Sequence, residues 1–141
     1  MWSIRDELRG KLGADSLYGE DGDDSLWGGQ QNDTLDGGNG TDYLFGETGN
    51  DTLYGRSGGD FLTGDGGTDT LYGNEGNDVL IGGTNAGPDG VKDTLTGNAG
   101  ADQFRNDTKI VIVWVNGKQL AIPTPEDTLT DFNAGSGDTK F

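Results

Sequence analysis

The sequence contains no cysteine and no histidine. Without cysteine, the chain can form neither a disulfide bond nor a cysteine-ligated metal site. Without histidine, it lacks the commonest general base and the usual zinc ligand, and most hydrolase mechanisms need one or the other. We therefore expect that the protein is not an enzyme.

Basic residues are also scarce, because 9 Lys and Arg stand against 25 Asp and Glu, for a formal net charge of −16 at pH 7. This charge argues against nucleic acid and anionic membrane surfaces as partners. No apolar run has the length of a transmembrane helix, and residues 1–10 lack the apolar stretch of a signal peptide. Divalent cations are the partners that this composition favours.

Glycine, in contrast, is abundant, with 28 residues, and it is periodic. Residues 46–81 read GETGNDTLY, GRSGGDFLT, GDGGTDTLY and GNEGNDVLI, which are four units of nine residues without a gap. Each unit has Gly at its first and fourth places, Asp at its sixth and Leu at its eighth. The same spacing runs back to Asp15 and Leu17. A fixed period of this kind predicts a stack of structural repeats.

The repeat predicts its own local conformation. Glycines at the first and fourth places permit positive φ and hence tight turns, and the last three places form a short strand whose Leu points inward. Two units then make one coil of 18 residues. Gln31 replaces the fourth-place Gly before Asp33, and Val91 or inserted residues replace it before Asp93. We expect a side chain there to resist positive φ and to weaken the sites at those turns.

The pattern G-G-x-G-x-D-x-U-x, with U a large apolar residue, resembles the RTX nonapeptide repeat, also called the hemolysin-type calcium-binding repeat. The resemblance covers roughly residues 11–105 and, more weakly, the tail to Phe141. It implies an all-β fold: a right-handed parallel β-roll, or solenoid, of two short-stranded sheets, closed by a C-terminal β-hairpin or strand cap. Residues 126–138 resemble the D-x-I-x-D-F…G-D segment that closes many such domains, although Lys140 stands where that family usually has an apolar residue.

The alternation of units sorts ten aspartates into two rows, which we name the aspartate rows. Within a row, neighbours lie one strand spacing apart, about 4.8 Å, so bare carboxylates repel each other. Calcium between successive turns reverses this repulsion, because it takes six to eight oxygens, largely from carboxylates and carbonyls, whereas Mg²⁺ requires a stricter octahedral site. One ion per successive pair gives about eight Ca²⁺ ions. The predicted ligands are Asp15, Asp33, Asp51, Asp69 and Asp93 in one row, and Asp24, Asp42, Asp60, Asp78 and Asp102 in the other.

Three segments are predicted. Residues 1–9 are an N-terminal cap, either a short helix or a degenerate half-repeat, and residues 10–105 are the β-roll. Within the roll, 15 residues separate Asp78 from Asp93, so a loop is expected at about 83–92. Residues 106–141 cap the other end: Ile110–Val115 reads as a strand, Asn116-Gly117 as a hairpin turn and Lys118–Ile122 as the return strand.

The outward positions of one predicted sheet are apolar: Trp27, Tyr43, Phe45, Phe61, Val79 and Ile81. A soluble monomer rarely leaves such a patch bare. We expect the C-terminal hairpin or a second copy of the chain to cover it. The alternative is that these residues are scattered β-formers on an exposed sheet.

The leading hypothesis for function is a calcium-triggered folding or stabilising module. The resemblance implies a secreted, extracellular protein that uses type I secretion, although Asp138-Thr139-Lys140-Phe141 fits such a secretion signal poorly. The alternative is a calcium-dependent carbohydrate- or surface-binding module, as in adhesins or beside polysaccharide-modifying enzymes, with Tyr18, Tyr54 and Tyr72 available to stack on sugar rings.

Overall fold

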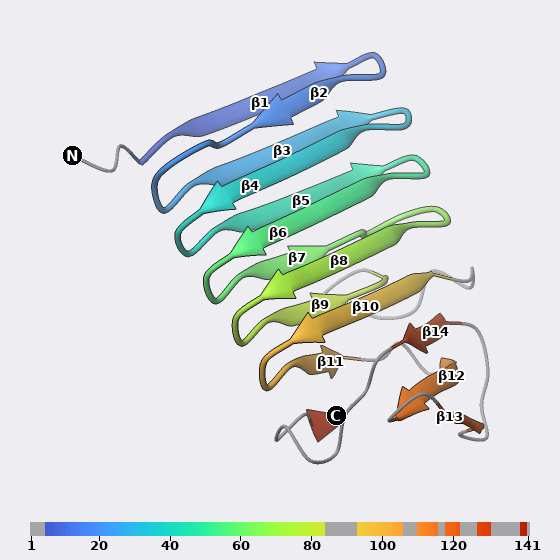
Figure 1. The fold of residues 1–141 in the computed structure, drawn as a ribbon. Helices are drawn as coiled ribbons and strands as arrows, with labels where there is room; N and C mark the ends of the chain where they lie inside the picture. Colours follow the sequence, from blue (N-terminus) through green and yellow to red (C-terminus); the bar gives the residue numbers. More distant parts are fainter. Residues whose placement is uncertain are drawn as a thin grey trace.

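The computed structural model describes residues 5–83, 93–105, 110–115, 118–121, 127–130 and 139–140, with side chains for 5–83 and 93–104. These residues form strands and turns and include no helix, so nothing in them forms a helix that could cross a membrane. Successive strands alternate between two largely parallel sheets, and the chain winds as a roll (Figure 1). The predicted all-β parallel β-roll is confirmed.

The first sheet contains every second strand of the roll. Its order is β1 (Glu7–Leu12), β3 (Ser25–Gln30), β5 (Tyr43–Thr48), β7 (Phe61–Thr63), β9 (Val79–Ile81), β11 (Gln103–Arg105) and β15 (Thr139–Lys140).

The second sheet contains the intervening strands and the C-terminal ones. Its order is β2 (Ser16–Tyr18), β4 (Thr34–Asn39), β6 (Thr52–Ser57), β8 (Thr70–Glu75), β10 (Thr94–Ala99), β14 (Asp127–Thr130), β12 (Ile110–Val115) and β13 (Lys118–Ala121).

The strands pair in the register that the repeat predicts. Leu26 lies opposite Leu44 in the first sheet, and Leu35 lies opposite Leu53 in the second, a step of 18 residues. Leu71 pairs with Leu95, and Leu80 with Phe104, so the step lengthens at one coil without a change of register. Six additional residues therefore belong to that coil. Residues 84–92, where most of the loop is predicted, lie outside the described residues.

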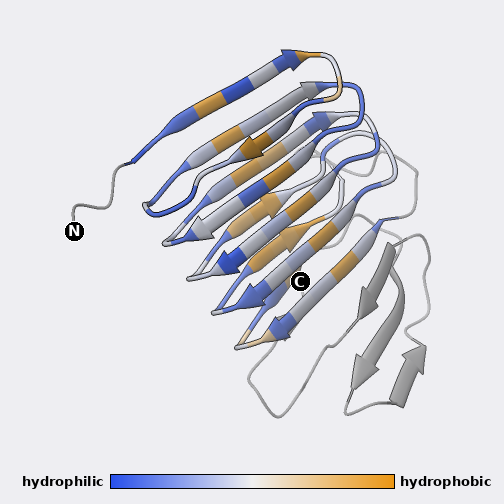
Figure 2. Ribbon diagram, turned by 45° about the horizontal axis from the view of Figure 1, so that its top comes forward, coloured by the Kyte–Doolittle hydropathy of each residue, from blue (hydrophilic) through white to orange (hydrophobic). Residues whose placement is uncertain are grey.

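The core is a double row of eighth-place side chains, and Figure 2 shows it as an apolar stripe across the strands. Leu8 and Leu17 of the first coil are only partly buried against this core. Each eighth-place side chain inside the stack is inaccessible to solvent, because a coil covers it on either side. The fully buried members are Leu26, Leu35, Leu44, Leu53, Leu62, Leu71, Leu80, Leu95 and Phe104.

The turns correct two expectations about glycine. Fourth-place residues do have positive φ, but Gln31 adopts it too, at 78°. Glycines at this place reach 158°, a region that only glycine tolerates, whereas Gln31 stays in the left-handed helical region. The expectation that its side chain would resist positive φ is wrong.

The second correction concerns the first place, whose glycines do not have positive φ in the described coils; the second-place residues have it instead, among them Glu47 at 72°. The first place needs glycine for space. A Cβ on Gly46 would lie 2.5 Å from Oδ2 of Asp51 and 2.7 Å from the carbonyl oxygen of Gly64 in the next coil. No side chain fits there.

The two ends of the roll differ. At the N-terminal end, residues 7–12 form strand β1, with Leu8 in register with Leu26, so this segment follows the repeat rather than a capping helix. At the other end, β12 and β13 form the antiparallel hairpin that the sequence predicts. Strand β14, however, lies between this hairpin and β10, and it pairs in parallel with β10.

The apolar patch on the first sheet is contiguous. Trp27 stacks on Phe45 with ring centroids 5.6 Å apart, and Phe45 contacts Phe61 at 6.2 Å. Exposure falls along the patch from 45% at Tyr43 to 3% at Ile81. Strands β12 and β13 continue the second sheet, so the hairpin does not cover this face in the way that we expected. Coverage by a second copy stays a prediction.

Candidate metal centre

The two aspartate rows form along opposite edges of the roll, because each Asp directly precedes a strand and successive strands alternate between the sheets. All ten predicted ligands occupy these rows. Asp15, in the first coil, is partly buried, and the other nine are at most 2% exposed. Carboxylates are almost never buried to this extent without a partner.

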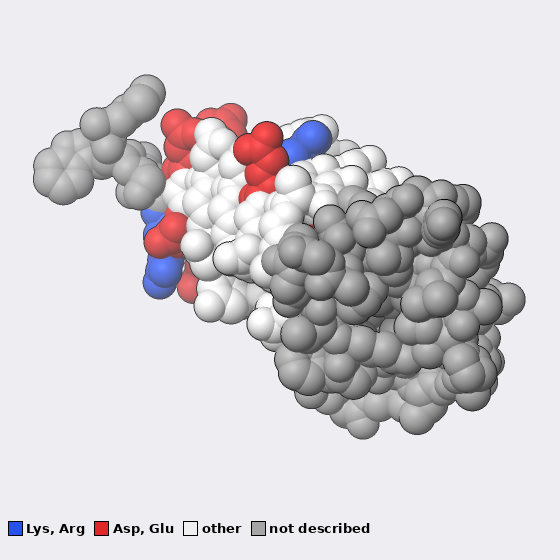
Figure 3. Space-filling view, turned by 60° about the horizontal axis from the view of Figure 1, so that its bottom comes forward, with Lys and Arg blue, Asp and Glu red and all other residues white. Residues whose placement is uncertain are grey.

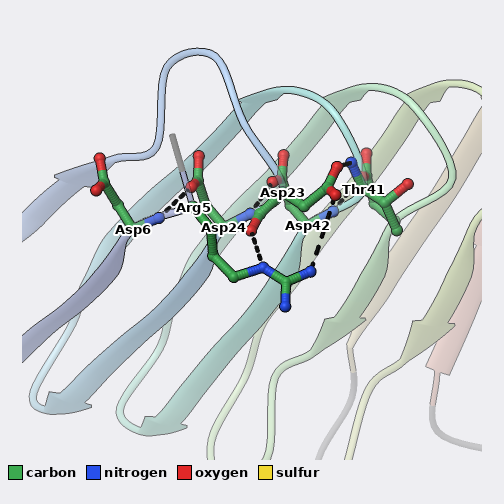
Figure 4. A network of polar contacts seen from close by, with 7 residues as sticks. Arg5, Asp6, Asp23, Asp24, Thr41 and Asp42 are labelled. Atoms are coloured by element: carbon green, nitrogen blue, oxygen red, sulfur yellow. Dashed lines mark hydrogen bonds and ion pairs between the residues drawn. The ribbon is translucent and has the colours of Figure 1, made fainter. Parts of the chain in front are cut away.

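In nine of the ten predicted ligands, all but Asp15, one carboxylate oxygen accepts a backbone N–H of the preceding coil. The N–H of Asp33 donates to Oδ1 of Asp51 in the next coil at 2.7 Å, and the same bond recurs along both rows at 2.6–2.9 Å. Figure 4 shows this contact between Asp6, Asp24 and Asp42. These bonds hold the nine carboxylates in one orientation relative to the coil before each of them.

The second oxygen, Oδ2, has no hydrogen-bond donor in six of these aspartates. In Asp24, Asp33, Asp42, Asp51, Asp60 and Asp78 this atom is buried and accepts no hydrogen bond. A buried carboxylate oxygen without a partner costs several kcal/mol, on the order of a lost charged hydrogen bond or more. A cation would remove that cost, and so would a proton.

Backbone carbonyls approach the same place. Beside Gly28, Oδ2 of Asp33 and the carbonyl oxygen of Gly46 lie 2.5 and 2.8 Å from one point, the position of a Cβ that glycine lacks. Beside Gly55, Oδ2 of Asp60 and the carbonyl of Gly73 converge in the same way. These two turns therefore each gather a carboxylate oxygen and a carbonyl oxygen of the adjacent coil, the mixed set of oxygens that calcium accepts.

Burial raises the proton affinity of these carboxylates. Desolvation is the largest cause, and it raises the pKa of Asp60 to about 7 and the pKa of Asp42, Asp51 and Asp78 to about 6. The backbone hydrogen bond to each carboxylate lowers its pKa, while repulsion between neighbours in the row raises it further. The rows are therefore poorly suited to carry their full negative charge alone.

Contacts at the fifth place of the repeat show that a carboxylate is not required to accept a backbone N–H. At the fifth place, Oδ1 of Asn32 accepts the N–H of Asn50, and Oδ1 of Asn50 accepts the N–H of Thr68, each at 2.9 Å. An amide therefore suffices to hold the backbone of the next coil. Because every sixth place is Asp in the ten units, the second carboxylate oxygen must serve another purpose.

The described residues contain no group of three or more His, Cys, Asp or Glu side chains arranged to hold an ion. An ion in the rows would therefore draw its protein ligands from successive aspartates and from backbone carbonyls. Calcium accepts such a set at high coordination number, whereas zinc in proteins takes His and Cys. The donor set fits Ca²⁺.

Asp6 is a row member that the predicted ligand set lacks. Its N–H donates to Oδ1 of Asp24 at 2.6 Å, so it occupies the first position of that row although it is exposed. Its nine-residue distance from Asp15 was the available signal. At the other end, Thr128 pairs with Thr94, which puts the backbone of Asp127 beside that of Asp93.

Neighbouring side chains contact Tyr54, one of the three tyrosines considered for sugar stacking. Tyr54 and Tyr72 stack on each other with centroids 5.1 Å apart and an interplanar angle of 6°. The Arg56 guanidinium lies 4.8 Å from the ring centre of Tyr54 and forms a salt bridge with Asp36 at 2.6 Å. Neighbouring side chains thus contact the Tyr54 ring, whereas a sugar needs a free aromatic face.

The RTX calcium-binding nonapeptide repeat model matches the chain in four copies, at residues 4–35, 36–71, 54–86 and 92–107. Together these matches cover more than half of the chain and include all ten predicted aspartates. No curated protein and no solved structure gives a significant match.

Proposed function

Because this chain belongs to the family of RTX calcium-binding nonapeptide repeats, we propose that its calcium-binding β-roll is a non-enzymatic module that folds when calcium binds. The observation that carries this proposal is the buried, unpartnered Oδ2 of four successive row aspartates, Asp24, Asp42, Asp60 and Asp78. Calcium neutralises these oxygens and joins adjacent coils, so its binding free energy becomes folding free energy.

The opposing contributions to the folding free energy of the roll support a calcium requirement. Each inner coil buries only about two eighth-place side chains, whereas folding it restricts the backbone of 18 residues and so costs conformational entropy. Glycine loses more conformational freedom than any other residue, and this chain has 28 glycines. Repulsion within the rows adds to that cost, and calcium binding offsets it.

We expect about eight ions, one between each pair of successive aspartates among the ten predicted ligands. The pair of Asp6 and Asp24 would add one more. Because each coil contacts only its neighbours, the coils should form cooperatively along the stack. A chain that stays unfolded at low calcium and folds outside the cell suits a secreted protein exported by a type I system, and we propose this route on the family resemblance.

The test is far-UV circular dichroism during a calcium titration from a chelated start, with Mg²⁺ as the control ion and isothermal titration calorimetry for the ion count. We expect a cooperative gain of β signal with Ca²⁺ and little with Mg²⁺, because the rows offer no strict octahedral site. A chain that has the full β spectrum in chelator, unchanged by calcium, would overturn the proposed switch.

A further inference from the structure

Asn39 and Gly40 form an Asn-Gly pair at the end of strand β4, and the Asn39 side chain is exposed. Asparagine is chemically labile, most of all before glycine, whose backbone nitrogen has no side chain beside it to hinder an approach to the asparagine amide. The fold nevertheless requires glycine here, because a Cβ on Gly40 would overlap the carbonyl oxygen of Gly22 in the coil before. The chain has one other such pair, Asn116-Gly117, outside the described residues.

The reaction open to this pair is deamidation. The backbone nitrogen of Gly40 attacks Cγ of Asn39 and loses its proton. The new N–Cγ bond closes a succinimide ring, and the Cγ–Nδ2 bond breaks to release ammonia. Water then opens the ring at either of its carbonyl carbons, which leaves aspartate or isoaspartate in place of the asparagine. Water is the only co-reactant.

In the roll, both reacting groups are hydrogen-bonded, and each is bonded to a different coil. The N–H of Gly40 donates to the carbonyl oxygen of Ser57 in the following coil at 2.8 Å. Nδ2 of Asn39 donates to Oδ1 of Asp21 in the preceding coil, also at 2.8 Å. The nitrogen of Gly40 must lose its bond to Ser57 before it can attack the side chain.

The backbone of Asn39 is fixed as well. Its N–H donates to the carbonyl oxygen of Glu20 at 2.7 Å, and its carbonyl oxygen accepts the N–H of Gly22 at 2.8 Å. A strand residue is extended, and ring closure requires it to rotate about its Cα–C bond. That rotation would move the Asn39 carbonyl away from Gly22 and the Gly40 N–H away from Ser57. The folded roll therefore opposes the reaction.

We infer that Asn39 is a modification site that reacts in the calcium-free chain and is protected in the calcium-loaded roll. An unfolded chain has none of these bonds between coils, so the Gly40 nitrogen is free to attack. Calcium binding folds the roll and forms the bonds. The extent of deamidation at Asn39 thus records the time that a chain has spent without calcium. This inference rests on the proposed calcium switch.

The products fit the roll less well than asparagine does. Both have a carboxylate where the Asn39 amide donates to Asp21, so repulsion between like charges replaces a hydrogen bond. Figure 3 shows acidic side chains already gathered toward the N-terminal end of the roll. Isoaspartate also adds a methylene group to the backbone between the bonds to Glu20 and Ser57. Modified chains should therefore need more calcium to fold.

The experiment is peptide mapping by mass spectrometry after incubation in chelator and in saturating calcium, with circular dichroism on the same samples. We expect conversion at Asn39 to be about tenfold or more slower in calcium, because the roll must first open locally. Asn50 and Asn77, each followed by Asp, are internal controls that should react slowly in both samples. Asn39→Gln should abolish the reaction, since its longer side chain closes a larger ring, and should still fold in calcium.

A third sample, in calcium with enough urea to unfold the roll, separates folding from calcium itself. Asn39 should react there as fast as in chelator. Equal rates in chelator and in calcium, in a chain that folds only with calcium, would overturn the inference and leave the switch intact, and so would no reaction in urea. A chain already folded in chelator, with Asn39 slow in both native samples, would overturn the switch and with it the calcium control of Asn39.

Discussion

At the scale of single residues, the fifth and sixth places of the repeat divide two tasks. Both accept a backbone N–H from a neighbouring coil, but in opposite directions: Asn50 accepts from the coil that follows, and Asp51 from the coil that precedes. Asp51 also has a second, buried oxygen without a donor, and no described fifth-place residue does. The difference between amide and carboxylate therefore separates holding the backbone from holding a cation.

Asp51→Asn tests this division. The amide oxygen can still accept the N–H of Asp33, but an NH₂ group replaces the free oxygen and cannot ligate a cation. We expect the calcium midpoint of folding to rise about tenfold or more, which corresponds to about 1.4 kcal/mol, and calorimetry to count fewer ions. In chelator the variant should be no less stable than the wild type, because a buried charge is lost.

Asn50→Ala is the matched control. It removes the acceptor for the N–H of Thr68 and should cost about 1 kcal/mol of stability with the ion count unchanged. If Asp51→Asn binds the wild-type number of ions at the wild-type midpoint, Asp51 serves only the backbone, and the assignment of the rows as calcium ligands is wrong.

At the scale of strands and turns, the nine-residue period predicts the strands, their register and the two rows, since it states which residues share a place. The period does not predict the backbone φ of the residue at each place. Glu47 has positive φ although it is not glycine, and Gly46 is required because Asp51 and the next coil come so close. Both facts depend on how coils stack, which no single unit reveals.

The order of the C-terminal strands in the second sheet is another feature that the repeat does not predict. The apolar run at 110–115 and the Asn-Gly turn indicate the hairpin by local signals, and the structure confirms the pairing of β12 with β13. That β14 follows β10 in the sheet, ahead of β12, depends on pairing between strands distant in sequence. Periodicity does not encode such pairing, so the hairpin was expected over the wrong face.

The longer coil gives a prediction at this scale. The hydrogen bonds between row aspartates are also present across this coil: Asp69 N–H donates to Oδ1 of Asp93 at 2.7 Å, and Asp78 N–H donates to Oδ1 of Asp102 at 2.9 Å. Deleting residues 85–90 would restore the step of 18 residues. We expect the same ion count and a stability change within about 1 kcal/mol, because loop length affects closure entropy only weakly.

Calorimetry and calcium-dependent melting measure both quantities for the deletion variant. Loss of an ion would mean that the deleted residues supply a ligand, and the calcium sites would then extend beyond the two rows.

At the scale of the whole molecule, the rows make stability depend on charge. The formal net charge is −16, and burial and repulsion from neighbouring carboxylates raise the pKa of Asp42, Asp51, Asp60 and Asp78 above the ordinary 3.8, so the ionised forms of these side chains destabilise the metal-free roll. Calcium and protons can both neutralise these groups. They should therefore act as competitors for the same rows.

The direction of the pH effect follows from these raised pKa values. The metal-free roll binds more protons than the unfolded chain between about pH 4 and pH 7, so acidification stabilises it in this window. The contribution is fully present below the unfolded pKa near 4 and is lost as pH rises through the folded values of about 6 to 7. In chelator, we expect β signal to appear as pH falls from 8 to about 5.

Calcium titrations at several pH values complete the test, because proton competition should raise the calcium midpoint as pH falls through the same range. Replacing Asp42 and Asp60 by Asn should reduce both the acid-induced gain in chelator and the pH dependence of the midpoint. A metal-free chain that loses β signal on acidification from pH 8 to about 5 would show that the row carboxylates are stabilised as anions without calcium. Neutralisation by the cation would then not be the source of folding.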